Sequence, residues 1–449
     1  MKLFLVATAF MVLFLCNDAC ALKGTWRGKL VVGQAELPLV FNFSENAEGK
    51  TECTLDSPLQ GAKGIPTVVT LCTADSVAIE CRTIGASFSG SIADGKISGK
   101  FAQRGMSFPL ILEQEEPLEE RRPQTPKPPF PYTIIDTVFT APDGARLSAT
   151  LTLPAEWKNK KVPAVVMVTG SGQQNRDEEL FEHKPFAVIA DYLARRGVAS
   201  LRYDDRGTGK STGDFLKGTT YVFKDDAKSG IEFLRKFKGV KSVGVLGHSE
   251  GGTIAFLLGG EKLPDFIISL AGMAVSGKEI LMQQNIRSLE QAGITGKDKE
   301  NSVALISLLF DIMAEQGRKG VVTQINTDSV AKANGINIPV AIMASLWALQ
   351  KVRTPWFDTI LTVNPRESLS KIACAVLAIN GDKDTQVEAE SNLAVIKELV
   401  PKAVVKKMPS LNHLMQHATT GEVSEYGEIR ETISPEVLKM ILDFIVMLP

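Results

Sequence analysis

The sequence is poor in metal-binding side chains and carries almost no net charge. It has only four histidines and six cysteines among 449 residues. No two cysteines show the Cys-x-x-Cys spacing of a zinc site, and the histidines are too dispersed to form a metal-binding motif, so we expect no metal. The formal net charge is −1 and no long basic run occurs, which argues against binding to nucleic acid.

Long apolar runs are also rare, and the clearest one lies at the start of the chain. Lys2 precedes an uncharged apolar run over residues 3–15, which is too short to cross a bilayer comfortably. Ala19-Cys20-Ala21 fits a small-x-small cleavage site. Residues 1–21 are therefore predicted to be a secretory signal peptide, with an N-terminal membrane anchor as the alternative. Without a second spanning run, we expect a soluble, exported protein, either periplasmic or secreted.

Export would remove the two cysteines of the signal peptide and would permit a disulfide among the rest. Cys53, Cys72 and Cys81 lie close together in the chain and allow at most one bond among them, and the sequence does not select the pair. Cys374 opens an apolar segment, which is typical of a buried core residue.

Residues 22–113 show the patterns of an all-β domain. A strand with one buried face is indicated by the alternating positions Leu37, Leu39, Phe41 and Phe43. Ala93-Asp94-Gly95 separates two short apolar stretches, which is a hairpin signal. No helical period of useful length appears, so we predict a small barrel or sandwich.

A change in composition follows this region. Residues 114–131 hold a run of charges and then a proline-rich stretch, which predicts a semi-rigid linker. From residue 132 to residue 449, apolar strands alternate with helical patterns, as in a doubly wound α/β sheet. The alternation stops for about a hundred residues, where helical patterns predict a cap over about residues 276–370.

The segment around Ser249 carries the strongest functional signal. An apolar strand pattern ends in Gly247-His248-Ser249-Glu250-Gly251, and an apolar helical pattern begins at once. This order of strand, sharp turn and helix is what a nucleophile elbow requires, and the flanking glycines allow the tight turn. We therefore predict Ser249 as the nucleophile. Ser211 lies in a second match to the five-residue pattern, but that match follows a polar loop and is interpreted as an ordinary turn.

A serine nucleophile needs a base, and the base needs an acid that orients it. Only His413 and His417 follow the serine, as the elbow fold requires. His413 is favoured because it sits in a turn after the last predicted strand, and His417 is the alternative. Asp384 is favoured as the acid because it lies further out at the carboxyl end of its strand, where active sites of open sheets gather. The alternative, Asp382, directly follows a glycine, and such a residue more often caps the turn itself.

Two backbone N–H groups are predicted to stabilise the oxyanion of the reaction. One belongs to Glu250 at the start of the helix. The other belongs to Ser171 in a glycine-rich loop after a strand, with Gly172 as the alternative. Trp356 and Phe357, in a proline-containing turn of the cap, are candidates for lining a substrate pocket.

Five segments, taken in order, resemble those of a known group of enzymes. They are Gly170-Ser-Gly-Gln-Gln-Asn-Arg-Asp-Glu178, Tyr203-Asp-Asp-Arg-Gly-Thr-Gly-Lys-Ser211, Gly247-His-Ser-Glu-Gly251, Gly381-Asp-Lys-Asp384 and Leu411-Asn-His413. Over about residues 132–449 the chain is similar to the α/β-hydrolase superfamily, and specifically to exported two-domain bacterial carboxylesterases of the EstD type. The N-terminal β-domain also resembles the extra domain of that group.

The resemblance implies Ser249 as nucleophile, Asp384 as acid and His413 as base in the hydrolysis of short-chain acyl esters through an acyl-enzyme, without a cofactor. The expected partner is therefore a small-molecule ester. An S9-type serine peptidase and a sugar-ester deacetylase stay open as alternatives, as does a glycan- or ligand-binding protein with an idle hydrolase domain.

Overall fold

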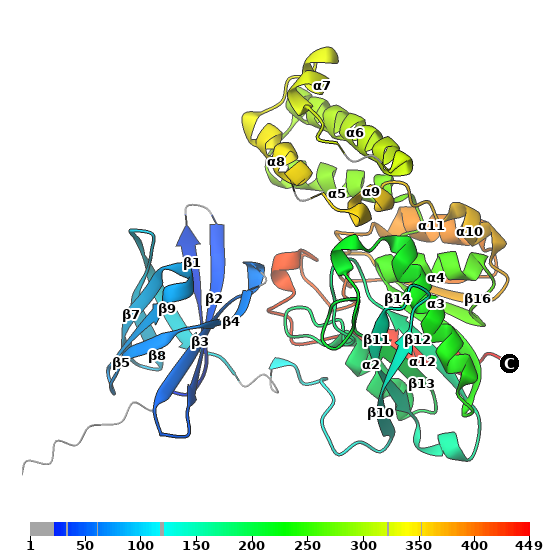
Figure 1. The fold of residues 1–449 in the computed structure, drawn as a ribbon, viewed down its shortest axis with the longest axis horizontal. Coiled ribbons are helices and arrows are strands. Elements are labelled where there is room, and N and C mark those ends of the chain that lie inside the picture. The colour runs from blue at the N-terminus through cyan, green and yellow to red at the C-terminus, as the bar shows by residue number, and fades with distance from the viewer. Residues whose placement is uncertain (1–21, 33–34, 61, 117–120, 321–322, 352) are drawn as a thin grey trace, which may run out of the picture. The chain divides into compact units, whose positions relative to one another are not determined.

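The computed structural model describes residues 22–449 except 33–34, 61, 117–120, 321–322 and 352. The predicted signal peptide, residues 1–21, lies outside the described residues. The chain divides into two compact units, Met1–Arg121 and Arg122–Pro449 (Figure 1). Within the described part of the chain, no helix is both long and apolar enough to cross a membrane.

The first unit is one antiparallel sheet of nine strands in the order β4-β3-β2-β1-β9-β8-β7-β6-β5. The strands are β1 (Gly24–Val32), β2 (Ala35–Glu45), β3 (Thr51–Ser57), β4 (Ala62–Pro66), β5 (Val68–Cys72), β6 (Ser76–Cys81), β7 (Ala86–Ala93), β8 (Lys96–Gln103) and β9 (Met106–Gln114). Two short 3-10 helices, η1 (Pro58–Gln60) and η2 (Arg82–Ile84), interrupt them. The predicted all-β character of this region is confirmed.

Local patterns explain this sheet. Leu39, Phe41 and Phe43 of β2 are buried in its core, as their alternation predicts. Asp94 and Gly95 form the turn between β7 and β8, and both have positive φ angles, 51° and 73°, which suits a tight two-residue hairpin. Cys53 and Cys81 are free thiols in the same core.

The second unit is built on an eight-stranded sheet in the order β10-β11-β13-β12-β14-β15-β16-β17. The strands are β10 (Thr133–Thr140), β11 (Arg146–Leu153), β12 (Val162–Val168), β13 (Ala199–Tyr203), β14 (Val240–His248), β15 (Phe266–Leu270), β16 (Ala375–Gly381) and β17 (Val404–Met408). β11 pairs antiparallel with β10 and β13, and the other neighbours are parallel. The predicted doubly wound α/β sheet is confirmed.

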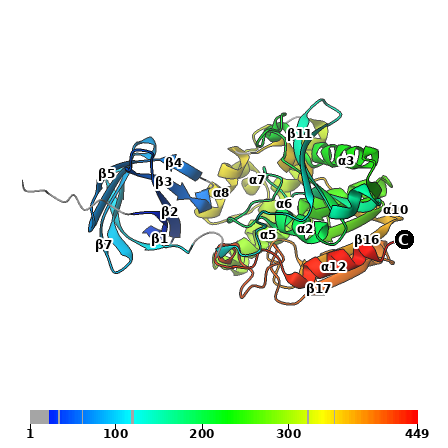
Figure 2. The same ribbon diagram turned by 90° about the horizontal axis from the view of Figure 1, so that it is seen from below.

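Helices cover both faces of this sheet (Figure 2). One face packs against α2 (Pro185–Ala194) and α12 (Pro435–Val446), and the other against α3 (Thr220–Lys236), α4 (Glu250–Gly260), α10 (Arg366–Lys371) and α11 (Ala389–Leu399). In β12, Val165 packs in the core between the sheet and helices α2 and α12, whereas Val166 packs in the core on the opposite face. Successive side chains of this strand are therefore buried on opposite faces of the sheet. Burial on both faces explains why the strand is apolar throughout. Three short 3-10 helices, η3 (Ala155–Lys158), η4 (Phe215–Lys217) and η5 (Val423–Glu425), lie in loops.

The interruption between β15 and β16 is helical. It contains α5 (Gly277–Gln291), α6 (Gly296–Lys319), α7 (Thr327–Ala333), α8 (Val340–Lys351) and α9 (Pro355–Ile360). Figure 1 shows these helices grouped together as one insertion. Apolar residues from them form their own core, which includes Leu305, Phe310 and Leu346. This helical insertion, referred to below as the cap, follows β15 and returns to β16, so it can reach the site formed at the ends of those strands.

The proline-rich stretch and Arg122, which precedes it, belong to the second unit. Arg122 is only 2% exposed, and its guanidinium donates to the carbonyl oxygens of Phe181, Gly427 and Ile429 at 2.7 to 3.2 Å. Gln124 donates to the carbonyl of Ile433 at 2.8 Å. These bonds attach the start of the second unit to the loops that follow β12 and β17.

Candidate active site

Ser249 occupies a sharp turn between β14 and α4. Its φ and ψ angles are 52° and −118°, a conformation that is uncommon for a residue with a side chain. The Ser249 N–H donates to the carbonyl of Leu270 at 2.9 Å, and its own carbonyl accepts from the N–H of Gly252 at 2.9 Å. The backbone is therefore held on both sides of the turn, and the half-buried serine is presented at the carboxyl edge of the sheet.

The glycines around Ser249 are required by close approach of backbone to backbone. A Cβ atom on Gly247 would lie 2.0 Å from the carbonyl oxygen of Gly251, and one on Gly251 would lie 2.0 Å from that of Val168. Both distances are far below van der Waals contact, so neither position accepts a side chain without movement of the backbone. The glycines let α4 begin directly against the end of β12.

The structure brings Asp384 and His413 together. Asp384 follows β16 and His413 follows β17, and Nδ1 of the histidine lies 2.8 Å from Oδ2 of the aspartate. The other oxygen of Asp384 accepts the N–H groups of Gln386 and Val387 at 2.8 and 2.9 Å. These bonds orient the carboxylate toward the imidazole, which leaves Nε2 of His413 as the atom available to a serine hydroxyl.

The competing residues lie elsewhere. Asp382 accepts the N–H of Ser410 at 2.6 Å and so braces the turn after β17. His417 is exposed and pairs with Glu431 at 2.9 Å. Ser211 is buried, and its hydroxyl donates to the carbonyl of Asp204 at 2.8 Å, as expected of a turn residue.

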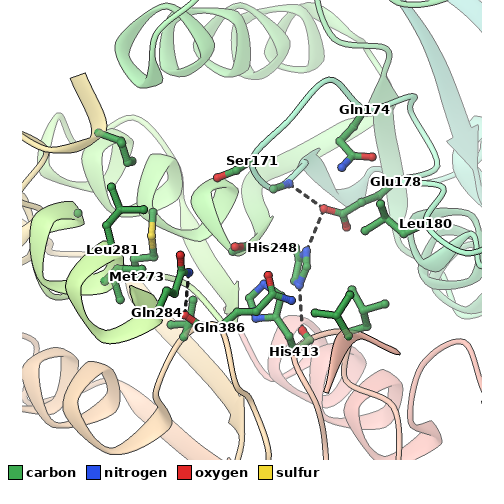
Figure 3. Close-up of a pocket in the computed structure, with 18 of the residues that line it drawn as sticks. Ser171, Gln174, Glu178, Leu180, His248, Met273, Leu281, Gln284, Gln386 and His413 are labelled. Carbon is green, nitrogen blue, oxygen red and sulfur yellow. Dashed lines mark hydrogen bonds and ion pairs between the residues drawn. The ribbon is translucent and has the colours of Figure 1, made fainter. Parts of the chain in front are cut away.

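A chain of hydrogen bonds that sequence reasoning missed links Glu178, His248 and the backbone of His413 (Figure 3). Glu178 Oε1 accepts the N–H of Gly170 at 2.7 Å and lies 2.9 Å from Nδ1 of His248. Nε2 of His248 lies 2.9 Å from the carbonyl oxygen of His413. Burial opposes a charge on His248, but the adjacent Glu178 carboxylate raises the pKa of the imidazole above its ordinary value. The chain thus joins the loop after β12 to the loop that carries His413.

The side chain of Glu250 makes a second set of contacts that was not predicted. Its carboxylate is buried and accepts hydrogen bonds from Ser171 Oγ at 2.8 Å, Thr220 Oγ1 at 2.6 Å and the Trp356 indole at 2.9 Å. Burial raises the pKa of Glu250, although these hydrogen bonds act in the opposite direction. The sequence predicted only a role for the backbone N–H of this residue, since a local pattern does not show where a side chain finds partners.

A cavity of about 340 Å³ opens above Ser249. Its lining includes His413, Ser171 and Trp356, and further residues from the cap and the loops: Gly170, Gln174, Glu178, Leu180, Phe181, His248, Met273, Gly277, Ile280, Leu281, Gln284, Ile360, Gln386, Val387, Leu414, Val423 and Tyr426. Gln284 of α5 donates to the carbonyl of Gln386 at 3.0 Å, which joins the cap to the loop of Asp384 (Figure 3). The cap therefore forms one wall of the cavity.

The two predicted pocket residues have different surroundings. Trp356 lines the cavity, whereas Phe357 does not belong to its lining and packs in the core of the cap, with its ring 5.9 Å from that of Phe310. Adjacent positions of α9 face different sides, so only one of the pair reaches the site. Among the described residues, no group of three or more His, Cys, Asp or Glu side chains could hold a metal ion.

The sheet order, the turn at Ser249 after β14 and the Asp–His pair after β16 and β17 define an α/β-hydrolase. The chain belongs to the family described as X-Pro dipeptidyl-peptidase (S15 family), whose sequence profile matches residues 143–417. The match covers more than half of the chain and includes Ser249, Asp384 and His413.

Individual relatives are more distant. The chain is 24% identical over 286 residues to esterase EstD from Thermotoga maritima, and this alignment covers 62% of each protein. It is 27% identical over 140 residues to an acyl transferase from Photobacterium leiognathi, and this alignment covers 31% of this chain and 43% of the relative. The alignments thus span less than two thirds of either relative. A solved esterase from Pyrococcus furiosus matches with a TM-score of 0.43 and 16% identity, over 70% of this chain and 90% of the other.

The contacts of Asp384 and His413 predict how Ser249 reacts with a fluorophosphonate probe. We expect His413→Ala and Asp384→Asn each to slow labelling of Ser249 by roughly 10³-fold or more, because the base is lost or misoriented. The matched changes His417→Ala and Asp382→Asn should alter the rate by less than about threefold, since neither side chain touches the pair. Gel-based labelling rates test this, and slow labelling confined to the control variants would contradict the assignment.

His183 predicts a pH-dependent loss of stability. Its ring is fully buried and lies 3.0 Å from Thr432 Oγ1 and from the carbonyl of Tyr426. Burial, helped by the charge of Arg122, lowers the pKa of His183 from 6.5 to about 4. Between these pH values the unfolded chain binds more protons than the folded one, so the free energy of unfolding falls as pH falls from about 6.5 to 4.

The loss in the free energy of unfolding that comes from His183 reaches roughly 3 kcal/mol once the pH is below both pKa values. Urea unfolding of the wild type at pH 7 and pH 4.5 should show it, and His183→Gln should flatten the difference between the two pH values. Equal pH dependence in wild type and His183→Gln would show that other groups are responsible.

Proposed function

We propose that the protein is a serine esterase that hydrolyses small, uncharged carboxylic esters. The observation that carries the proposal is that Ser249 and His413 line one cavity with a mostly uncharged lining, and that Asp384 bonds to His413 from behind it at 2.8 Å. Glu178 is the one acidic side chain in the described lining, and it is bonded to His248 and to the N–H of Gly170. The likeness to EstD, an esterase, supports the same function.

The mechanism follows from the positions of these groups. Ser249 Oγ attacks the ester carbonyl while Nε2 of His413 removes its proton, and Asp384 stabilises the resulting imidazolium. The N–H groups of Glu250 and Ser171 stabilise the oxyanion. The tetrahedral intermediate collapses as His413 protonates the leaving alcohol, which leaves an acyl group on Ser249. Water, deprotonated by His413, then attacks this acyl-enzyme, and the acid is released with Ser249 restored.

The family description gives a second candidate, a peptidase that removes X-Pro dipeptides. Such a substrate carries a free N-terminal ammonium, and a site that reads this charge needs a carboxylate that is available to it. In the described lining, the carboxylate of Glu178 is only 1% exposed, and its Oε1 already accepts from Gly170 and lies beside His248. We therefore favour esters over N-terminal dipeptides.

A substrate panel tests the choice between these activities. We expect 4-nitrophenyl acetate and butyrate to be hydrolysed, and Ser249→Ala and His413→Ala each to lower kcat by roughly 10⁴-fold. Asp384→Asn should cost somewhat less, because part of the catalysis survives when only the orienting group is lost. A Gly-Pro-4-nitroanilide substrate should be cleaved at least about 10²-fold less efficiently than the esters. Preference for the anilide would replace the esterase proposal with a peptidase.

Failure of Ser249 to react with a fluorophosphonate, in a protein that is folded by circular dichroism, would instead favour a binding protein with an idle hydrolase domain. A sugar-ester deacetylase would be indicated if acetylated sugars were far better substrates than 4-nitrophenyl acetate. The same wild-type preparation serves for both measurements.

We also propose that the protein acts outside the cytoplasm, in the periplasm or as a secreted enzyme. The support is the charged start, the short apolar run and the small-x-small site within residues 1–21. Expression of the full chain in a Gram-negative host should release a mature protein that begins at Leu22. Intact mass and N-terminal sequencing of the osmotic-shock fraction check this, and an uncleaved chain retained in the cytoplasm or membrane would contradict it.

A further inference from the structure

The carboxylate of Glu250 joins three separate parts of the second unit. Ser171 belongs to the loop after β12 that offers a proposed oxyanion donor, Thr220 begins α3, and Trp356 lies on α9 of the cap. All three donate to the same carboxylate, at 2.6 to 2.9 Å. Ser171 and Trp356 also line the cavity over Ser249, whereas the side chain that joins them is only 2% exposed.

The hydrogen bonds use both carboxylate oxygens of Glu250 as acceptors. Oε1 accepts from Thr220 and Trp356, and Oε2 accepts from Ser171 and Trp356. A buried carboxylate is costly unless hydrogen bonds satisfy it, and these donors are uncharged. The position of Glu250 in the first turn of α4 adds to its stability, since helix N-termini favour negative charge. A glutamine at position 250 would replace one of the two acceptor oxygens with an NH₂ group. That donor would then face side chains that are themselves donors.

We propose that the Glu250 side chain is a positioning residue that couples the cap wall at Trp356 to the oxyanion loop at Ser171. The inference rests on the proposed ester hydrolysis, which supplies its main readout. Because both ends of the connection bond to one buried carboxylate, displacement of the cap at Trp356 is transmitted to the loop whose N–H stabilises the oxyanion. Contacts between substrate and cap wall thereby contribute to kcat as well as to binding.

A double-mutant cycle tests this coupling. Ser171→Ala removes one donor but keeps the backbone N–H, and Trp356→Phe removes the other but keeps an aromatic wall. Each should lower kcat for 4-nitrophenyl butyrate about tenfold with KM changed less than about threefold, because the oxyanion donor is misplaced in the transition state. The double variant should be no more than about twofold worse than either single one, since breaking either end breaks the connection.

Glu250→Gln supplies the second arm of the experiment. In that background, neither Ser171→Ala nor Trp356→Phe should change kcat by more than about twofold, because the connection is already broken. Trp347→Phe is the matched control, since Trp347 lies on α8 of the cap and is 43% exposed. It should leave kcat and KM unchanged. Melting curves establish that each variant is folded, and the cycle in the wild-type background decides the question if Glu250→Gln does not fold.

The outcomes separate the two levels of the proposal. Independent tenfold losses that multiply to about a hundredfold, or a Trp356→Phe variant that raises KM alone, would overturn the coupling and leave the esterase proposal intact. A wild type that reacts with a fluorophosphonate but hydrolyses no ester would overturn the esterase proposal. In that case the labelling rates of the same four proteins of the cycle decide whether Ser171 and Trp356 are coupled.

Discussion

The site depends on the close backbone contact at the turn that holds Ser249. Because no side chain intervenes at Gly251, the first turn of α4 lies directly against the carbonyl of Val168 at the end of β12. A Cβ on Gly170 would lie only 3.2 Å from that of Ser249, so the loop after β12 also passes directly beside the serine. A serine with positive φ costs of order 1–3 kcal/mol and persists only where its surroundings over-determine it. Here the packing of β12, β14 and α4 does so.

Buried carboxylates then hold the loops that surround this turn. Glu178 joins the N–H of Gly170 to His248, and Glu250 joins the same loop to the cap. Asp205 accepts the N–H of Gln174 and the hydroxyl of Thr169, and burial raises the pKa of its carboxyl to about 8. The first part of the loop after β12 is thus held at Thr169, Gly170, Ser171 and Gln174. Donors that are fixed before the substrate arrives need little reorganisation during the reaction, which is the basis of electrostatic catalysis.

Much of the fold could be predicted because its strands and helices follow from local sequence patterns. The strands of the parallel sheet are apolar runs because both of their faces are buried, and the cap was evident from a hundred residues with helical patterns. The proline-rich stretch shows the limit of such patterns. Its composition is that of a linker, yet Arg122 is buried against three carbonyls that lie 59, 305 and 307 residues further along the chain. No local pattern contains such contacts.

The sequence by itself determined the order of strand, serine and helix, and it reduced the base and the acid to two candidates each. Those features depend on neighbours within a few residues, where glycine, chain direction and apolar periodicity act directly. Only the tertiary structure decided that Asp384 rather than Asp382 faces His413, that Trp356 rather than Phe357 lines the cavity, and that Glu178 reaches His248 across 70 residues. These choices are set by where side chains point after strands and helices have packed, and that direction is a property of the assembled fold.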